Sequence, residues 1–391
     1  MIDNILYEYM EEMLNQTPTS FHRYKYKDID WEGRLTGIVG PRGVGKSTMM
    51  LQYIGEHRHE GLHLYVSADN PYFSSHSLAE LADEFVKEGG THLYIDEVHK
   101  YKNWSTELKQ THDVHGLLKV TFTGSSVLDI KKGEADLSRR VVIEEMQGLS
   151  FREYLELFHQ IWVPVYSLEE ILSHQVTIPE LPHPLPLFRK YLKEGYYPFA
   201  LEGRFATRLL QVVNQTIEID IPMFADMKAS TARKLKQMLM LVSGLAPVKP
   251  NADNLAREIG VSKNNISDYL LYLERAGMIG QLRDDTSGLR GLGKVEKVYV
   301  DNPNLMYDLT NNAPEIGNVR ETFFYNQMRT NNPVLSSRES DFRIGSYTFE
   351  IGGRKKGKKQ IEDVVNGIIV RDDIEYGSGI IIPLWHFGLT Y

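Results

Sequence analysis

The sequence predicts a multidomain α/β protein whose first domain is built on an open parallel sheet. Short buried-strand patterns alternate with helical patterns between residues 35 and 126, which is typical of such a sheet. A glycine-rich loop follows the first of these strands and leads directly into a helical pattern. The chain of 391 residues is also long for one hydrophobic core, so we expect two or three domains.

The composition narrows the class of protein. With 42% hydrophobic and 25% charged residues, the chain is typical of soluble globular proteins. Its formal net charge of −8 does not favour a protein that mainly neutralises nucleic acid, so any such contact is expected to be local. The sequence has no cysteine, which excludes disulfides, thiolate catalysis and cysteine-bound zinc. It has neither a signal-like start nor an apolar run of about 18 residues, so we expect a cytoplasmic protein without membrane contact.

The first elements place a glycine-rich motif between a strand and a helix. Residues 5–14 carry apolar side chains at helical spacing and predict an amphipathic helix ahead of the first strand. The run LTGIVG at 35–40 predicts a buried strand, GPRGVGKS at 40–47 fits G-x-x-x-x-G-K-[ST] at every position, and residues 48–54 continue as a helix. This order favours a phosphate-binding P-loop over an ordinary glycine-rich turn, which is the alternative.

The chemistry of a P-loop explains the residue types. Glycines let successive backbone N–H groups curl around phosphate oxygens, and the following helix directs its positive end toward them. Lys46 is expected to neutralise the β- and γ-phosphates of ATP, and the Ser47 hydroxyl to hold Mg²⁺. The predicted nucleotide-binding residues are Gly40, Pro41, Arg42, Gly43, Val44, Gly45, Lys46, Ser47 and Thr48, with Ser125 from a later strand.

An acidic pair supplies the carboxylates that a P-loop needs. The run THLYIDEVH at 91–99 reads as a buried strand that ends in Asp96 and Glu97. Asp96 is expected to hold the metal, and Glu97 to polarise the attacking water. A solvated acidic pair on the surface is the alternative. The presence of Glu97 favours a protein that hydrolyses the nucleotide over a nucleotide-dependent switch.

Two further strands are expected to bring polar side chains to the same edge of the sheet. Residues 62–70 end at Asp69, and residues 117–126 end in the polar cluster TGSS. In an open parallel sheet, ligands bind outside the carboxyl ends of the strands. Ser125 is therefore a candidate sensor of the γ-phosphate, with a helix-capping serine as the alternative. Asp69 also fits ordinary turn chemistry.

These motifs together resemble a known family. The stretches GPRGVGKST, LYIDEVH, TFTGSS and LSRRVVIEEMQGLSFREYL are similar to those of AAA-type ATPases of the archaeal-ATPase and prokaryotic NTPase group, over residues 30 to 160. The resemblance implies ATP, Mg²⁺ and, often, assembly into homo-oligomers. It also implies that Arg140 acts on the γ-phosphate of the same or a neighbouring subunit, although Arg139 stands where glycine is more usual. A surface charge is the alternative for Arg140.

The middle of the chain reads as a helical connector over residues 161–245 and a separate unit over 246–300. Four prolines between 179 and 186 are expected to lie outside helices and central strands. Residues 251–281 predict two helices joined at Gly260 and then a short strand, which looks like a winged helix. Lys263 is the one cation of SKNN at 262–265, which opens the second helix, so a structural role or contact with a protein is favoured over contact with DNA.

The last part, residues 301–391, predicts a helix over 318–328, a hairpin formed by 340–345 and 347–353, a helix over 358–366, and later strands over 367–371 and 379–391. This resembles the restriction-endonuclease-like PD-(D/E)XK domains, which implies a metal site at Glu321, Asp341 and Glu350. Gly352 stands where that motif requires lysine, so we expect a degenerate site. A lysine or arginine of the basic run RKKGKK at 354–359 reaching the site is the alternative, and a solvated basic loop is another.

The sequence therefore predicts an ATPase that couples its nucleotide state to a partner bound by the C-terminal region. Two alternatives remain: a slow nucleotide-dependent switch that binds a protein, and an ATP-regulated nuclease, against which Gly352 counts. The partner itself, protein or DNA, is not predicted.

Overall fold

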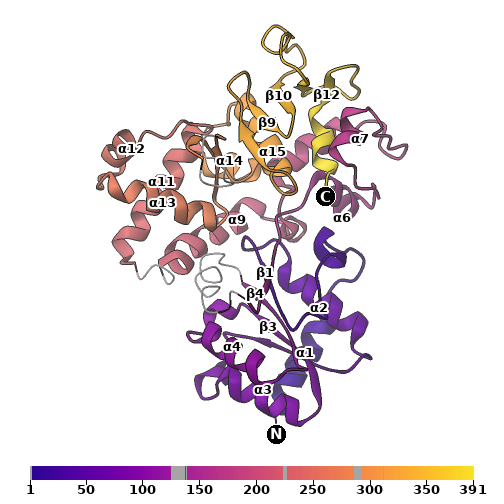
Figure 1. Ribbon diagram of the computed structural model, residues 1–391, viewed down its shortest axis with the longest axis vertical. Coiled ribbons are helices and arrows are strands. Elements are labelled where there is room, and N and C mark those ends of the chain that lie inside the picture. Colours follow the sequence, from indigo (N-terminus) through magenta and orange to yellow (C-terminus); the bar gives the residue numbers. More distant parts are fainter. Residues whose placement is uncertain (1, 125–136, 138, 223–226, 286–292, 311) are drawn as a thin grey trace. The chain divides into compact units, whose positions relative to one another are not determined.

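The structure is a computed structural model that describes residues 2–124, 137, 139–222, 227–285, 293–310 and 312–391. It consists of two compact units, Met1–Gly148 and Leu149–Tyr391, which are drawn from indigo to yellow along the chain in Figure 1. Among the described residues, no helix is both long and apolar enough to span a membrane.

The first unit contains a five-stranded, fully parallel sheet in the order β2-β3-β4-β1-β5. Its strands are β1 Leu35–Val39, β2 Leu62–Ser67, β3 Gly90–Asp96, β4 Lys119–Gly124 and β5 Val142–Glu145. The central strands are buried along nearly their whole length, which explains their continuous apolar runs. The strands predicted at 35–40, 62–70, 91–96 and 117–126 are confirmed: β1 and β2 end earlier than predicted, β3 begins one residue earlier, and β4 begins at Lys119.

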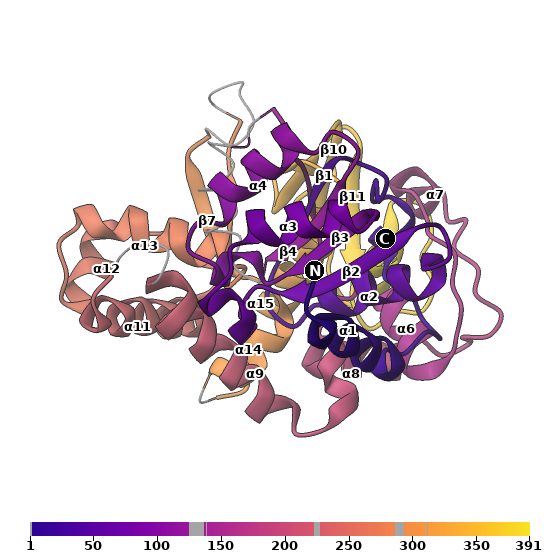
Figure 2. The ribbon, with the colours of Figure 1, turned by 90° about the horizontal axis from the view of Figure 1, so that it is seen from below.

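Helices cover both faces of this sheet. They are α1 Asn4–Gln16, α2 Lys46–His57, α3 Leu78–Lys87 and α4 Trp104–Val114. Figure 2 shows α3 and α4 on one side of β3 and β4, and α2 on the other. Phe85 of α3 and Leu108 of α4 belong to one core with Leu93 and Val120 of the sheet. On the opposite face, Tyr53 of α2 stacks on Trp31 at 4.3 Å between ring centroids.

The second unit begins with helices. They are α6 Phe151–His159, α7 Leu168–Leu172, α8 Leu185–Glu194, α9 Phe205–Gln215 and α11 Ala229–Leu245. The LSFREYL segment forms the start of α6, where Ser150 accepts from the N–H of Glu153 and Glu153 accepts from the N–H of Ser150. The prediction that all four prolines lie outside helices is wrong for Pro186, which occupies the first turn of α8. A proline is tolerated there because its missing N–H has no partner within the helix.

The stretch predicted as two helices and a strand has that order. Helix α12, Ala252–Ile259, ends at Gly260 with a φ of +66°, and α13, Asn264–Arg275, follows. Strands β6, Ile279–Arg283, and β7, Val295–Val300, then pair antiparallel. Seven apolar residues of this stretch were expected to form its core; Tyr272 is half-buried, and the others are buried, namely Leu255, Ile259, Ile266, Leu270, Leu273 and Met278.

The last elements form a mixed sheet in the order β12-β11-β10-β9-β8, preceded by α14 Pro303–Leu309 and α15 Ile316–Met328. The strands are β8 Val334–Ser336, β9 Phe342–Ile344, β10 Tyr347–Gly352, β11 Gly367–Arg371 and β12 Ile381–Pro383. Strands β9 and β10 make the predicted antiparallel hairpin, and β11 runs parallel to β10. Phe324 of α15 packs against Phe342 and Phe349 of the sheet, with ring centroids 5.1 and 5.2 Å apart.

Two predictions in this region are wrong. Residues 358–366 form turns instead of a helix, and only Ile361 in this segment is buried, so no apolar face holds a helix there. The strand predicted over 379–391 is limited to β12, because Pro383 lacks the N–H that would continue the ladder. A 3₁₀-helix over Leu384–Leu389 follows and buries Trp385 and Phe387.

Candidate nucleotide site

The P-loop lies at the carboxyl end of β1 and curves back over it. A Cβ atom on Gly40 would clash with the carbonyl oxygen of Met146, so the start of the loop accepts only glycine. Gly45 has a φ of +95° and caps the amino end of α2, a conformation that costs glycine little. The first N–H groups of a helix have no acceptor within that helix, and those of α2 follow directly on the loop, as binding of phosphate requires.

Lys46 is held inside the P-loop. Its Nζ donates to the carbonyl oxygens of Gly40 at 2.9 Å and Pro41 at 2.7 Å, and the side chain is buried. These contacts keep the ammonium group within the curve of the loop. Phosphate oxygens that enter this curve can take the place of the carbonyl oxygens as its partners.

Asp96 lies beside Ser47 and receives hydrogen bonds from three hydroxyl groups. Ser47 Oγ donates to Asp96 Oδ1 at 2.9 Å, Thr123 Oγ1 donates to the same oxygen, and the Tyr65 hydroxyl donates to Oδ2 at 2.9 Å. Burial raises the pKa of Asp96 above its ordinary value, while the three hydroxyl groups act in the opposite direction. The carboxylate is thus placed at the carboxyl end of β3 by three neighbouring elements.

Glu97 has an unusual backbone conformation. Its φ of +51° lies in the left-handed region, which is uncommon for residues other than glycine. Its N–H donates to Thr123 Oγ1 at 3.1 Å. Its carboxylate Oε2 lies 3.4 Å from Nη2 of Arg42, which belongs to the P-loop. The acidic pair and the P-loop are therefore in direct contact.

The donor set fits magnesium. The Ser47 hydroxyl and the Asp96 carboxylate are hard oxygen donors 2.9 Å apart, beside the loop that is built to receive phosphates. Magnesium in such sites takes most of its other ligands from phosphates and water. In keeping with this, no group of three or more His, Asp or Glu side chains in the described part of the chain is arranged to hold a metal alone.

Three further residues were singled out from the sequence: Asp69, Ser125 and Arg140. Asp69 accepts from Ser67 Oγ at 2.6 Å, beyond the end of β2. Ser125 lies outside the described residues. Arg140 forms a two-point ion pair with Asp113, with Nε–Oδ1 and Nη2–Oδ2 distances of 2.7 and 2.9 Å. This pair holds the pKa of Asp113 down at about 2.

Arg140 lies away from the P-loop of its own chain. It precedes β5, whose first residue, Val142, is level with Thr36 near the amino end of β1, whereas the P-loop follows the carboxyl end. At about 3.3 Å per residue, more than 10 Å along the strand direction separates Arg140 from Gly40. This placement favours a role toward a neighbouring subunit over one toward its own nucleotide.

In the second unit, Glu321 and Asp341 meet around a lysine that the sequence prediction did not include. Lys297 Nζ lies 3.0 Å from Glu321 Oε2 and 3.5 Å from Asp341 Oδ1, and the Tyr299 hydroxyl donates to Glu321 Oε2 at 2.9 Å. Burial and the nearby Glu321 raise the pKa of Asp341 to about 6. The Lys297 ammonium is thus the cation that these carboxylates share.

Glu350, the third predicted acid, has partners of its own. It is 2% exposed, accepts from Ser340 Oγ and pairs with Lys356 Nζ. The Lys356 side chain occupies the space above Gly352, where a Cβ atom would lie 2.6 Å from its Cγ. A lysine from the basic run therefore reaches the carboxylate that lacks a lysine at position 352.

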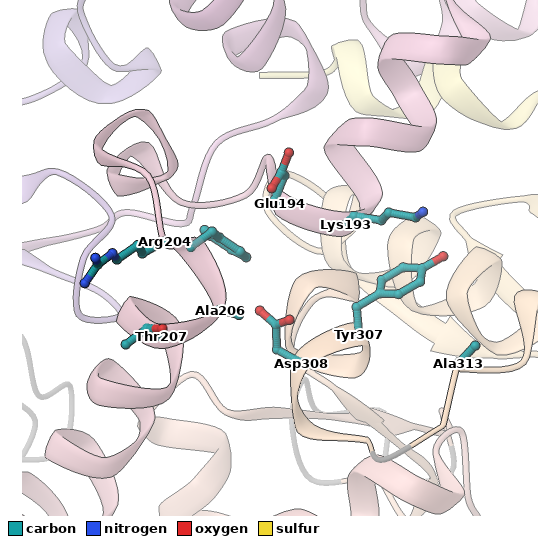
Figure 3. A pocket seen from close by; sticks show the side chains of 9 residues that line it. Lys193, Glu194, Arg204, Ala206, Thr207, Tyr307, Asp308 and Ala313 are labelled. Carbon is teal, nitrogen blue, oxygen red and sulfur yellow. The ribbon is translucent and has the colours of Figure 1, made fainter.

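A cavity of about 570 Å³ also lies in the second unit. It is lined by Lys193, Glu194, Arg204, Phe205, Ala206, Thr207, Tyr307, Asp308 and Ala313, which come from α8, α9, α14 and neighbouring segments. Figure 3 shows the Asp308 carboxylate turned toward Ala206, with the Arg204 side chain extending away from it. Burial and the nearby Glu194 raise the pKa of Asp308 to about 6. No sequence motif marks these residues.

Comparisons with known proteins agree with the geometry of the first unit. Residues 32–155 match the family model of an AAA domain, which includes the P-loop and the acidic pair. Residues 185–315 match the model of a domain of unknown function, DUF8612, which includes every residue that lines the cavity. No curated protein matches the sequence significantly.

Solved structures show weaker likenesses. A Walker-type ATPase of Pyrococcus abyssi is 12% identical, with 76% of this chain and 99% of that chain covered and a TM-score of 0.45. DnaA from Aquifex aeolicus, bound to AMPPCP, is 15% identical, with 70% and 89% covered and a TM-score of 0.25. PCH-2 of C. elegans is 15% identical, with 69% of each chain covered and a TM-score of 0.26.

Proposed function

We propose that the protein binds ATP with Mg²⁺ and hydrolyses it to ADP and phosphate, in a domain that spans residues 1–160. One observation supports this proposal above the others. The Ser47 hydroxyl at the amino end of α2 lies 2.9 Å from the Asp96 carboxylate at the end of β3, although 49 positions separate them in the sequence. A P-loop and an acidic pair brought together in this way are what phosphoryl transfer from a nucleotide requires.

The residues of the site have distinct roles in this mechanism. The N–H groups of the P-loop and the Lys46 ammonium bind and orient the β- and γ-phosphates. Glu97 accepts the proton of the water that attacks the γ-phosphorus, as the bond to the β–γ bridging oxygen breaks. Magnesium, held by Ser47 and Asp96, supplies positive charge against the developing charge on the phosphates.

A slow nucleotide-dependent switch that binds a protein partner is the second candidate. The contact of Glu97 with Arg42 favours it, because a carboxylate engaged by a P-loop cation is not free to take a proton from water. In this reading the nucleotide changes which surfaces the protein presents, and hydrolysis only limits the lifetime of the ATP-bound form.

We further propose the functions of the other parts of the chain. Residues 161–245 are a connector, and residues 246–300 are a winged helix, supported by the helix pair α12–α13 and the β6–β7 hairpin. Residues 301–391 are a nuclease-like domain that has lost cleavage, because the Lys297 ammonium lies between Glu321 and Asp341 and offsets part of the negative charge that would hold a metal. The chain couples ATP to a DNA or protein partner through these regions.

The nuclease alternative also has one supporting observation. Lys356 pairs with Glu350 and fills the space above Gly352, as a lysine taking over the task of the missing one would do. An ATP-regulated, metal-dependent nuclease is therefore a third candidate, and a plasmid-cleavage assay tests it.

Steady-state ATP turnover tests the proposal. Wild type and Glu97→Gln are compared at physiological salt, with and without double-stranded DNA. The variant is expected to bind ATP and to turn over at least about 100-fold more slowly, the usual range for loss of a general base. Stimulation of wild type by DNA favours a DNA partner. Slow turnover that is equal in the two proteins contradicts hydrolysis by Glu97 and favours the switch.

A further inference from the structure

We propose that Thr123 is a positioning residue, which holds both acids of the Asp96–Glu97 pair through one hydroxyl group. The inference rests on the ATP hydrolysis proposed above. In the proposed mechanism the two acids have separate tasks, since one holds the metal and the other takes a proton. Both tasks depend on one orientation of the strand end that carries them.

The geometry of the hydroxyl group is specific. Thr123 Oγ1 donates its proton to Asp96 Oδ1 and accepts the backbone N–H of Glu97 at 3.1 Å. A hydroxyl has one donor and two acceptor positions, so both bonds form at once. Thr123 is 1% exposed, which leaves no water to replace either bond.

The sheet brings the three residues together. Strands β3 and β4 are adjacent and parallel, and Ile95 of β3 is level with Phe122 of β4. The next residues, Asp96 and Thr123, therefore lie side by side at the carboxyl edge. A β-branched side chain has few rotamers, so threonine keeps its hydroxyl directed at β3 more firmly than serine does.

Asp96 depends on this bond for its orientation. The carboxylate is buried, and the hydroxyl groups that donate to it hold its oxygens in one direction. Ser47, one of the three hydroxyl donors, is also the proposed second metal ligand. Thr123 and Tyr65 are the two donors that have no proposed contact with the metal.

Glu97 depends on the same hydroxyl for its direction. Its left-handed backbone, with φ at +51°, turns the chain sharply at the end of β3. The bond from its N–H to Thr123 fixes the peptide between the two acids in this orientation. Loss of the bond frees that peptide, and the Glu97 carboxylate then samples other directions. The Tyr65 hydroxyl donates to Asp96, whereas the hydrogen bond of the Glu97 N–H goes to Thr123, which makes Tyr65 a matched control.

The test compares Thr123→Val, Thr123→Ser and Tyr65→Phe in the full chain. Two quantities are measured: kcat for ATP at saturating Mg²⁺, and the Mg²⁺ concentration needed for half-maximal binding of a fluorescent ATP analogue. Both hydroxyl-deleting variants are expected to shift the Mg²⁺ requirement upward by about 10-fold. Only Thr123→Val is expected to lower kcat by roughly 10- to 100-fold, because it alone frees Glu97. Thr123→Ser is expected to stay within about threefold of wild type in both quantities, since the hydroxyl remains.

Several outcomes overturn the inference. If Thr123→Val and Tyr65→Phe have the same kcat at saturating Mg²⁺, Thr123 does not position Glu97. If the Mg²⁺ requirement of Thr123→Val equals that of wild type, Thr123 does not position Asp96. Thermal unfolding shows whether each variant is folded. If Thr123→Val does not fold, Thr123→Ala takes its place, and equal turnover of the alanine and serine variants overturns the proposal.

Failure of the proposed function gives a different result. Wild type that turns over no faster than Glu97→Gln contradicts hydrolysis by Glu97, and the Mg²⁺ requirement for binding then still tests the contact of Thr123 with Asp96. If wild type turns over ATP faster than Glu97→Gln, and Thr123→Val turns it over as fast as wild type, only the role of Thr123 is contradicted.

Discussion

Arg42 of the P-loop lies against Glu97 of the acidic pair, with Nη2 of the arginine 3.4 Å from Oε2 of the glutamate. Both side chains are 23% exposed, so water screens the pair. Ion pairs of this kind contribute about 0–1 kcal/mol. The contact is therefore weak enough to exchange for phosphate or water when a nucleotide binds.

Replacing Arg42 by glutamine tests whether this contact restrains hydrolysis. Removal of the charge frees Glu97, and we expect ATP turnover to rise by up to about fivefold, the equivalent of 1 kcal/mol. We would measure kcat and the affinity for ATP. The control is the double variant that carries both Arg42→Gln and Glu97→Gln. A fall in both quantities contradicts the restraint and shows that Arg42 binds phosphate instead.

Arg140 gives a prediction about assembly, because its place at the amino end of β5 keeps it from the nucleotide of its own chain. If it acts on the nucleotide of a neighbour, Arg140→Ala and Glu97→Gln are each expected to be inactive alone. A mixture regains turnover, since an intact Arg140 of one subunit then meets an intact Glu97 of another.

The mixing experiment needs two controls. Asp113→Asn weakens the ion pair that holds Arg140 and is expected to leave turnover of the assembled protein at or above the wild-type value. Sedimentation at the assay concentration shows whether subunits associate. Arg140→Ala with wild-type turnover contradicts any role in the reaction, and the ion pair with Asp113 is then its whole function.

The sequence predicted the parts of the site that are fixed by local rules. The P-loop is continuous in sequence, and its backbone conformation needs glycine at defined positions. The motif alone therefore predicted Lys46 and Ser47 as neighbours of a phosphate site. The pattern of a buried strand that ends in two acidic residues predicted the roles of Asp96 and Glu97. The partners that hold them, Tyr65 and Thr123, come from two other strands, and only the pairing order of the sheet brings them together.

The same reasoning explains the errors in the last part of the chain. The hairpin of β9 and β10 is local and was predicted correctly. Lys297 reaches Glu321 through tertiary packing, so no spacing in the sequence indicates it. Lys356, which reaches Glu350, belongs to the basic run that was the alternative source of the missing lysine. A motif defined by spacing, E-x-K, pointed to Gly352 as a loss, whereas the structure has Lys356 in that space.

A cleavage assay examines the C-terminal acids. Purified wild type is incubated with supercoiled plasmid DNA and Mg²⁺ or Mn²⁺, with and without ATP, and nicked product is measured. We expect no nicking above the Glu350→Ala control, because the Lys297 ammonium lies between Glu321 and Asp341 and offsets part of the charge that would hold a metal. Nicking that disappears in both Glu350→Ala and Lys356→Ala contradicts the degenerate site and makes Lys356 the working lysine.

His63 makes the stability of the first unit depend on pH. It is 4% exposed, neither of its ring nitrogens has a hydrogen-bond partner in the structure, and its ring centroid lies 4.4 Å from that of His92. Burial and the neighbouring His92 lower the pKa of His63 to about 4. The unfolded chain, with a pKa near 6.5, binds the proton more readily between pH 6.5 and 4. Stability therefore falls as the pH falls through this window.

Unfolding by urea at pH 7 and pH 5 tests this prediction. Wild type is expected to lose about 1–2 kcal/mol more of its free energy of unfolding over this interval than His63→Phe, which has no proton to bind. The phenyl ring suits the site because the imidazole nitrogens have no partners to lose. Asp308 and Asp341, whose pKa values are raised to about 6, act in the opposite direction, but they are present in both proteins and cancel in the comparison. Equal losses in the two proteins would mean that His63 already binds a proton in the folded state at pH 5, and its burial would then not control its charge.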